Sequence, residues 1–419
     1  MDNQMPDQKN TVEVNGRTYA WPLNPVVIVC VDGSEPAYIE EAVKAGVMPF
    51  TESMIKNGTD LRAHCVIPAF TNPNNMSIVT GCPPSVHGIC GNFFYDAKTD
   101  SEVMMNAPEL LRTETIFKAF FDQGAKIAIV TAKDKLRKLL GYGLDYTSGR
   151  AICFSSEKAD ETTEAEHGIE NAQALVDRPI PSVYSAELSE FIFDAGVKLM
   201  ERDKPDIMYL STTDYIQHKH APGTPVANEF YAMMDGYWTR LDALGATVAL
   251  TADHGMIDMH NANGVPDVVY LQPILDEMIG TAKARVILPI TDPYVVHHGA
   301  LGGYATAYLP DGCDPQQICA KLESIDGIEV ALTNRQACDR YQLPNDRVGD
   351  IVVIVTANKA IGSEPDKHDL SGLDVPLRSH GGLSTQNVPL MLNRPLSGLP
   401  ENQQLRNFDI FSVVLNNAR

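Results

Sequence analysis

The chain has 419 residues, of which 44% are hydrophobic and 21% are charged, and its formal net charge is −21. This length and composition are typical of a globular protein with a large buried core. The acidic balance excludes a general nucleic-acid binder and a protein held on anionic membranes by charge, so an anionic ligand requires a local source of positive charge such as bound cations or a few lysines.

The first two-thirds of the chain alternates between predicted strands and helices. A hairpin around the Asn15-Gly16 turn precedes a continuous apolar run over 25–31, which is typical of a strand buried on both faces. Further strands are predicted over 126–131, 206–211 and 247–251, and helices over 114–121, 188–201 and 227–244. This alternation predicts an α/β fold with a doubly wound core sheet and helices on both faces.

The pattern changes over residues 264–367. Predicted strands at 284–290, 304–309, 327–332 and 350–356 surround one predicted helix at 315–325. We interpret 264–367 as an inserted, smaller α+β cap, so that residues 1–263 and 368–419 form the catalytic core. The core resumes with a strand at 389–392 and closes with a helix at about 408–415.

The cysteines and the N-terminal sequence indicate the cellular compartment in which we expect the protein. The eight cysteines are scattered and form no Cys-x-x-Cys pair, which favours buried free thiols in a reducing compartment. The first ten residues are polar, and no apolar run reaches the length of a membrane-spanning helix. We therefore expect a soluble, cytoplasmic protein.

Residue types that bind metals follow several of the core strands. In open α/β sheets, ligands bind outside the carboxyl ends of the strands. Taken singly, each of these residues has an ordinary alternative as a helix cap or a surface residue. The candidates are Asp32, the pair Asp214 and His218 at helical spacing, the pair Asp253 and His254, and His380 in a Ser-His-Gly-Gly loop.

A mixture of aspartate and histidine suits zinc or manganese better than calcium or magnesium, which prefer oxygen ligands alone. Two adjacent divalent ions also supply the positive field that the acidic chain lacks, and they clamp the attacking and leaving oxygens in phosphoryl transfer. The residues alone therefore predict two-metal phosphoryl transfer. A non-catalytic metal-binding or scaffolding protein remains the alternative from a different class.

Thr71 lies in a turn between the apolar run 66–70 and a helix predicted to start near Asn75. A hydroxyl at a strand-to-helix turn is poorly placed for core packing. It is well placed for chemistry on an anion, because the helix N-terminus behind it offers free N–H groups. The ordinary alternative is a helix cap or turn residue.

In their order, these motifs resemble the alkaline phosphatase superfamily, in its nucleotide pyrophosphatase/phosphodiesterase-like branch. The matches span Asp32 to His380 and therefore nearly the whole catalytic core. The residues that carry the resemblance are Val31–Gly33, Thr71–Asn74, Thr80-Gly81 with His87-Gly88-Ile89, Asp214 with His218, Ala252–Met256 and His380-Gly381.

The resemblance implies an alkaline phosphatase-like fold and two Zn²⁺ ions per chain. One ion would be held by Asp214, His218 and His380, and the other by Asp32, Asp253 and His254. Thr71 would bridge the two ions and act as the nucleophile. The resemblance also implies that Asn92 hydrogen-bonds a phosphoryl oxygen and that His218 contacts the substrate.

Lys133 and Lys135 follow the strand at 126–131, at its carboxyl end. Basic residues are disfavoured in a first helical turn, which favours a functional reading in which both lysines bind a second anionic group of the substrate. In this respect the chain is similar to the members of the branch that hydrolyse phosphonoacetate to acetate and phosphate. A phosphodiesterase or nucleotide pyrophosphatase, or a phosphomutase, on the same core remains the alternative.

Other histidines receive no role in this scheme. His297 and His298 lie in the expected cap beside Gly299; a position that reaches the site is the alternative, and the interpretation as bystanders is favoured. His220 is the remaining candidate for a supporting position. We expect the partner to be a small phosphonate, with no nucleic acid or membrane, and a homodimer as the possible assembly.

Overall fold

In the computed structural model, the described residues are 11–281, 283–291, 298–399 and 403–418. They contain a seven-stranded sheet in which five neighbouring strands are parallel and the two strands at one edge are added by antiparallel pairing. The predicted doubly wound α/β core is confirmed, and the antiparallel edge is an addition to it. In spatial order the strands are β4 (Thr59–His64), β19 (Asn387–Leu392), β10 (Thr247–Thr251), β3 (Val26–Cys30), β9 (Ile207–Ser211), β7 (Ile127–Thr131) and β8 (Ala151–Ser155).

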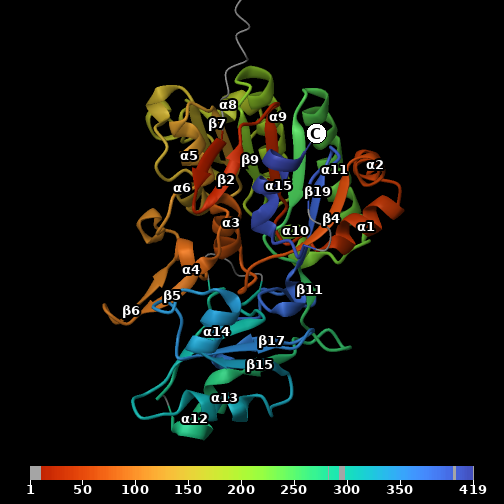
Figure 1. The fold of residues 1–419 in the computed structure, drawn as a ribbon. Helices are drawn as coiled ribbons and strands as arrows, with labels where there is room; N and C mark the ends of the chain where they lie inside the picture. Colours follow the sequence, from red (N-terminus) through yellow and green to blue (C-terminus); the bar gives the residue numbers. More distant parts are fainter. Residues whose placement is uncertain (1–10, 282, 292–297, 400–402, 419) are drawn as a thin grey trace, which may run out of the picture.

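The central strands are buried on both faces, as their continuous apolar sequences predict. Alternate residues of β3 serve different cores: Ile28 and Cys30 belong to one hydrophobic cluster, and Val27 and Val29 to the other. Helices cover both faces (Figure 1). The first core includes α3 (Thr71–Thr80), α5 (Ile116–Asp122), α6 (Asp134–Leu140) and α15 (Ile410–Asn417), and the second includes α1 (Pro36–Lys44), α2 (Pro49–Asn57), α9 (Glu187–Arg202) and α11 (Pro225–Ala243).

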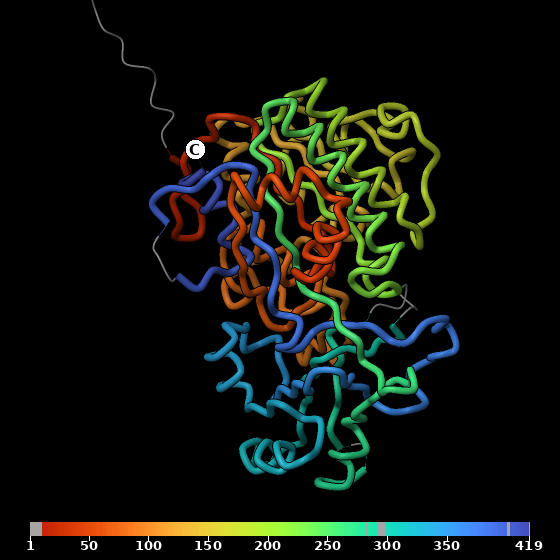
Figure 2. The backbone as a smooth tube through the Cα atoms, turned by 90° about the vertical axis from the view of Figure 1, so that its right-hand side faces the viewer, coloured from red at the N-terminus to blue at the C-terminus, as the bar shows by residue number. Residues whose placement is uncertain are grey.

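A second, antiparallel sheet lies below the core in the views of Figures 1 and 2, where its segments are green to blue. Its order is β13 (Arg285–Ile287), β14 (Tyr304–Tyr308), β16 (Ile351–Val355) and β15 (Ile328–Thr333). Three helices accompany it: α12 (Leu271–Ile279), α13 (Pro315–Leu322) and α14 (Asn334–Tyr341). The sequence analysis found only α13, although Thr333 and Gln336 form a capping box that marks the start of α14.

Two short strand pairs lie outside both of these sheets: β11 (Ile257–Asp258) with β18 (Arg378–Ser379), and β12 (Val268–Tyr270) with β17 (Ala360–Gly362). A hairpin of β5 (Phe93–Asp96) and β6 (Ser101–Met104) reaches from the core toward the second sheet. There the Tyr308 hydroxyl donates a hydrogen bond of 3.2 Å to the Tyr95 carbonyl. Elements of both regions therefore meet at the carboxyl end of the parallel strands.

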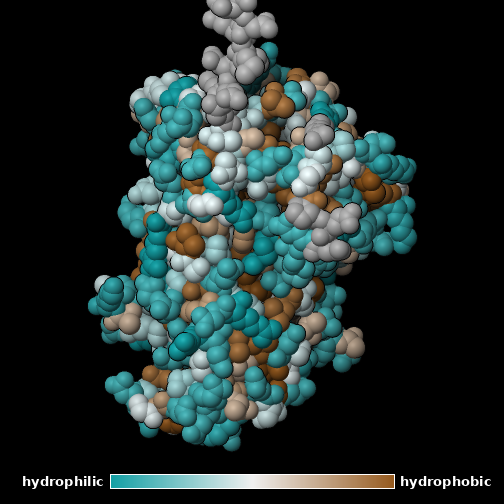
Figure 3. Space-filling view, viewed as in Figure 1, coloured by the Kyte–Doolittle hydropathy of each residue, from teal (hydrophilic) through white to brown (hydrophobic). Residues whose placement is uncertain are grey.

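The N-terminal hairpin is confirmed as β1 (Thr11–Val14) and β2 (Arg17–Ala20), and its turn residues Asn15 and Gly16 both have positive φ. All eight cysteines are free thiols. None of the helices in the described part of the chain combines the length and apolar character needed to cross a bilayer. Hydrophilic residues dominate the face drawn in Figure 3, in keeping with the high charge of the chain.

His87 ties α3 to the short helix α4 (Pro84–His87), because its Nε2 lies 2.8 Å from the Ser77 hydroxyl. Burial, with a smaller contribution from Arg347, lowers the pKa of His87 to about 3. Below its ordinary pKa of about 6.5, the unfolded chain therefore binds a proton that the folded chain does not. The free energy of unfolding should fall by about 1.4 kcal/mol per pH unit from this residue as the pH drops from 6 to 5.

Urea unfolding of the wild type and the His87→Gln variant at pH 6 and pH 5 checks this expectation. The variant should lose less stability between the two pH values, by about one proton's contribution. The comparison uses only the change in the free energy of unfolding between the two pH values, so a general destabilisation of the variant does not affect it. Equal slopes in the two proteins would contradict it.

Candidate active site

Three aspartates follow three neighbouring strands of the parallel sheet. Asp32 and Asp253 each lie two residues after their strands, β3 and β10, and Asp214 lies three residues after β9; all three side chains are buried. Gly33 permits this crowding: its φ is +72°, and a Cβ there would lie 3.1 Å from the Asp214 Cβ. The Gly33 N–H donates a hydrogen bond of 3.2 Å to Asp253 Oδ1. The Val-Asp-Gly sequence thus allows the carboxylates to converge.

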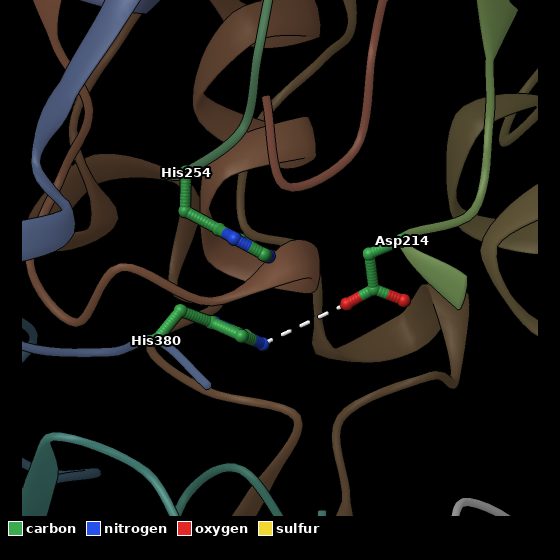
Figure 4. Close-up of side chains that lie close together, drawn as sticks. All are labelled: Asp214, His254 and His380. Atoms are coloured by element: carbon green, nitrogen blue, oxygen red, sulfur yellow. Dashed lines mark ion pairs between the residues drawn. The ribbon is translucent and has the colours of Figure 1, made fainter. Parts of the chain in front are cut away.

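Histidine rings complete two groups of side chains. His254 Nε2 lies 3.3 Å from Asp32 Oδ1 and 3.6 Å from Asp253 Oδ2. On the other side, Asp214 Oδ2 lies 3.0 Å from His218 Nε2 and 3.8 Å from His380 Nε2. Figure 4 shows the His254 and His380 rings side by side, with Asp214 facing them across the site. The two rings are stacked, with centroids 3.6 Å apart.

The β11–β18 pair explains this stacking. β11 starts three residues after His254 and β18 ends immediately before His380, so their antiparallel pairing brings the two histidines together. Arg378, on β18, adds further ties: its buried guanidinium donates to the carbonyls of Gln217 and Met256. One arginine therefore holds the three histidine-bearing segments in a fixed arrangement.

Backbone carbonyls fix the orientation of the three histidine rings. The Nδ1 atoms of His218 and His380 lie 2.7 Å from the carbonyls of Arg378 and Ala69, and the Nδ1 of His254 lies 3.0 Å from the carbonyl of Gly255. Because a carbonyl only accepts, each Nδ1 carries a proton, and the tautomer this selects for a neutral ring has its lone pair on Nε2. The lone pairs are thus available on the side where the aspartates lie.

The electrostatics of the site favour a divalent cation. Burial, followed by the charges of Asp214 and Asp253, raises the pKa of Asp32 well above its ordinary value. Burial likewise raises the pKa of Asp253, and burial together with the neighbouring histidines lowers the pKa of His380 well below its usual range. Among the described residues, Asp32 Oδ1 has no hydrogen-bond donor. Buried carboxylates and neutral imidazoles of this kind fit a metal, which would offset their mutual repulsion.

Two groups of three residues could each hold a metal ion, because the potential ligand atoms within each group all lie within 4.8 Å of one another. One set comprises Asp32, Asp253 and His254, the same three residues that the resemblance implies for one ion. The other comprises Asp214, His254 and His380, so His254 is shared between the sets. His218, which the resemblance implies as the third ligand beside Asp214 and His380, lies next to Asp214 instead of within this second set.

Thr71 is the first residue of α3, so the prediction that the helix starts near Asn75 is wrong by one turn. The Thr71 hydroxyl lies 3.4 Å from His254 Nε2. The preceding loop is held by Asn74, whose amide group bonds to the carbonyls of Val66, Pro68 and Phe70. The Thr71 hydroxyl therefore lies beside the candidate metal ligands, and Thr71 is itself the first residue of α3.

Asn92 and the two lysines lie in the same cavity as Thr71. Asn92 Oδ1 accepts a hydrogen bond of 3.2 Å from the N–H of Asn72, which leaves its amide N–H groups as donors. Lys133 precedes α6 and Lys135 lies in its first turn. The cavity has a volume of about 80 Å³ and is lined by residues that include Asp32, Thr71, Asn92, Lys133, Lys135, Asp214 and His380.

The sequence analysis missed several residues at this site. His298, interpreted above as a bystander, lines the cavity and stacks on His218 with ring centroids 5.4 Å apart. His297 lies outside the described residues. Asn75 donates to Asp253 Oδ2 and to the Thr71 carbonyl, and so supports two predicted residues at once. His220 is not among the residues that line the cavity.

Comparisons with known proteins identify the family. The model of the type I phosphodiesterase/nucleotide pyrophosphatase family matches residues 26–382. Phosphonoacetate hydrolase from Sinorhizobium meliloti 1021, solved in complex with phosphonoacetate and with phosphonoformate, is 59% identical, with a TM-score of 0.94 over 97% of this chain and 99% of that chain. A phosphonoacetate hydrolase from Penicillium oxalicum is 42% identical over 72 residues, which are 17% of this chain and 89% of that protein.

More distant relatives share the fold or a short segment. Murine ectonucleotide pyrophosphatase/phosphodiesterase 5 is 16% identical, with a TM-score of 0.63 over 93% of this chain and 94% of that chain. The chain spans only 22% of an uncharacterised pyrophosphatase/phosphodiesterase of Schizosaccharomyces pombe and 10% of human ectonucleotide pyrophosphatase/phosphodiesterase family member 1, at 26% and 32% identity. The chain is a hydrolytic enzyme that belongs to the type I phosphodiesterase/nucleotide pyrophosphatase family, and within it to the phosphonoacetate hydrolases.

Proposed function

We propose that the protein hydrolyses the carbon–phosphorus bond of phosphonoacetate to acetate and phosphate, through a phosphothreonine at Thr71. The observation that carries this proposal is the shared cavity, because Thr71 and two of the aspartates, Asp32 and Asp214, line the same small space as Lys133 and Lys135. A substrate with a phosphonate at one end and a carboxylate at the other matches that arrangement. The 59% identical relative solved with phosphonoacetate supports it.

The residues that would hold two Zn²⁺ ions are Asp32, Asp253 and His254 on one side and Asp214, His218 and His380 on the other, with Thr71 between them. Their mixture of carboxylate oxygens and imidazole nitrogens supports zinc over calcium or magnesium. When bound, the two cations would favour the alkoxide form of the Thr71 hydroxyl and withdraw charge from the phosphonate oxygens.

Thr71 Oγ1 attacks phosphorus, and the P–C bond breaks as the new P–O bond forms. The electron pair of the P–C bond moves onto carbon and delocalises into the carboxylate as an enolate-like species. The Lys133 and Lys135 ammonium groups stabilise that charge more than they stabilise the ground-state carboxylate, which lowers the barrier. The Thr71 hydroxyl gives up its proton as the P–O bond forms, and one proton, delivered through water, converts the enolate-like species to acetate, so no net proton is lost in this half of the reaction.

The second half of the reaction releases phosphate. Water attacks the phosphothreonine, the Thr71 hydroxyl leaves with a proton, and one water is consumed per phosphonoacetate over the cycle. The Asn92 amide N–H groups donate to a phosphoryl oxygen in both halves, because the Asn92 carbonyl oxygen is held by Asn72. The same constellation thus serves formation and hydrolysis of the intermediate.

A phosphodiesterase or nucleotide pyrophosphatase activity on the same core is the second candidate, because the family match covers most of the chain. The cavity volume favours the smaller substrate. Sites for drug-sized ligands occupy roughly 300–1,000 Å³, whereas this cavity measures about 80 Å³. A nucleotide also needs a surface on which its base stacks, whereas the lysines that line this cavity, Lys133 and Lys135, suit a second anionic group.

We also propose that residues 264–367 form the inserted cap on a core of 1–263 and 368–419, which the four-stranded antiparallel sheet within 264–367 supports. A cytoplasmic location is supported by the eight free thiols, which suit a reducing compartment. The homodimer stays a prediction, and light scattering of the purified protein checks it.

A metal assay combined with phosphate release tests the proposed function. We expect about two metal equivalents per chain, release of phosphate from phosphonoacetate, loss of that release after chelation and its recovery when Zn²⁺ is restored. If the metal-loaded protein leaves phosphonoacetate intact and hydrolyses a nitrophenyl phosphodiester instead, the second candidate is correct.

A further inference from the structure

Thr131 is the last residue of β7 and is only 1% exposed, yet it lines the cavity together with Lys133 and Lys135. Its hydroxyl Oγ1 has no hydrogen-bond partner among the described residues. A neighbouring cavity threonine differs in this respect, because Thr212 Oγ1 accepts a hydrogen bond of 2.9 Å from the N–H of Asp32. Thr131 is therefore a buried residue in the cavity wall whose hydroxyl has no hydrogen-bond partner among the described residues.

A buried hydroxyl without a partner costs free energy, and such a group calls for a physical explanation. The methyl group of threonine packs as that of valine does, so packing alone does not require the hydroxyl. Because threonine is β-branched, its χ1 has few accessible values, which makes the hydroxyl a well-positioned donor. A ligand in the cavity that accepts a hydrogen bond would satisfy it.

The position of Thr131 indicates which part of a bound ligand would accept the hydrogen bond from its hydroxyl. The phosphoryl end is fixed by Thr71 and by the aspartates that follow β3, β9 and β10. Thr131 is on β7, which lies beyond β9 in the sheet, and is separated from Lys133 by one residue. It therefore belongs with the lysines, on the side of the cavity formed by the end of β7 and the start of α6.

We propose that the Thr131 hydroxyl donates a hydrogen bond to the carboxylate of the substrate and thereby determines specificity for phosphonates that carry one. This inference rests on the proposed function, since it names a further contact of the same substrate. The lysines attract any anion, whereas a fixed hydroxyl selects an acceptor at one position. A phosphonate without the carboxylate would leave the hydroxyl unsatisfied, and discrimination of this kind is strong.

The test compares Thr131→Val, which removes only the hydroxyl, with Thr131→Ser, which keeps it. Ser155→Ala is the matched control: Ser155 pairs with Thr131 in the register of β7 and β8, is equally buried and has no hydrogen-bond partner among the described residues, but does not line the cavity. The measurements are kcat and KM for phosphonoacetate and the inhibition constant of inorganic phosphate, which lacks a carboxylate.

We expect Thr131→Val to lower kcat/KM for phosphonoacetate by about tenfold or more, as for a lost hydrogen bond to a charged group. The inhibition constant of phosphate should stay within about twofold, Thr131→Ser should keep most of the wild-type kcat/KM, and Ser155→Ala should match the wild type. Because valine fills the same volume, the thermal midpoint of Thr131→Val should be unchanged or higher.

Two results would overturn the inference while leaving the proposed function intact: an unchanged kcat/KM in Thr131→Val, or a parallel weakening of phosphate inhibition. The first would mean that the hydroxyl binds only water, and the second that the substitution disturbs the site as a whole. A wild-type enzyme that does not hydrolyse phosphonoacetate would instead overturn the proposed function, and this inference with it.

Discussion

The Thr71→Ala variant is expected to lose phosphate release from phosphonoacetate by about 10⁴-fold or more, as for removal of a nucleophile. No bond to phosphorus can form from an alanine, and a water attacking directly would lack the position that α3 gives to the hydroxyl. Metal content should stay unchanged, because the aspartates and histidines remain in place. Phosphate release and metal content are therefore measured on the same preparation.

Thr80→Ala is the matched control for this variant. Thr80 is the last residue of α3, is fully buried, and its hydroxyl donates to the carbonyl of Met76 within the helix. The same substitution at the other end of the helix should therefore preserve turnover. Mass spectrometry of acid-quenched wild-type enzyme should detect a phosphorylated Thr71. Turnover that survives in Thr71→Ala with its metals bound would show that another group attacks phosphorus.

The candidate site was largely predictable because its residues follow strands whose apolar runs are easily recognised. Asp32 and Asp253 follow stretches rich in β-branched residues. Parallel strands have their carboxyl ends at the same edge of the sheet, whatever their separation in sequence, so the residues that follow them meet there. Asp214 and His218 have the spacing of one helical turn. These local patterns, together with the order of the motifs, were sufficient to predict which residues meet.

The start of α3 was predicted wrongly for a reason that lies in Pro73. The Asn-Pro-Asn-Asn sequence was interpreted as a turn, yet Pro73 falls in the first turn of α3, where a missing N–H removes no helical hydrogen bond. Asn74 then bonds to the loop before the helix instead of breaking the helix. Local sequence alone does not distinguish these two uses of the same residues.

Contacts made over long distances in sequence were not predictable from local patterns. His298 reaches the cavity from the second region of the chain, and the guanidinium of Arg378 bonds to Gln217 across 161 positions. Thr131 has the sequence character of an ordinary β-former at the end of a strand, and only the structure shows that it lines the cavity. Such residues become visible when the packing around the site is known.

The double variant Lys133→Ala with Lys135→Ala is expected to lower kcat/KM for phosphonoacetate by about 10²- to 10⁴-fold, as for two lost hydrogen bonds to charged groups. Most of the loss should appear in kcat, because the negative charge on the leaving group grows in the transition state. Inhibition by inorganic phosphate should change far less, since phosphate lacks the carboxylate that the two lysines bind. The kinetic constants for phosphonoacetate and the inhibition constant for phosphate separate the two effects.

Lys126→Ala with Lys138→Ala provides a control with the same change in net charge. Lys126 lies immediately before the first residue of β7, at the end of the strand away from the cavity. Lys138 lies in α6, and its exposed side chain pairs with Asp134. If the loss in the Lys133 and Lys135 variant reflected a weaker long-range attraction of anions, the control would reproduce much of it, and high salt would abolish the difference. If the two lysines stabilise the leaving group directly, the control retains wild-type turnover. Phosphonoacetate turnover that survives in the double variant, with loss of activity toward a nitrophenyl phosphodiester, would instead mean that the lysines serve a phosphodiester substrate, and that carbon–phosphorus cleavage does not depend on them.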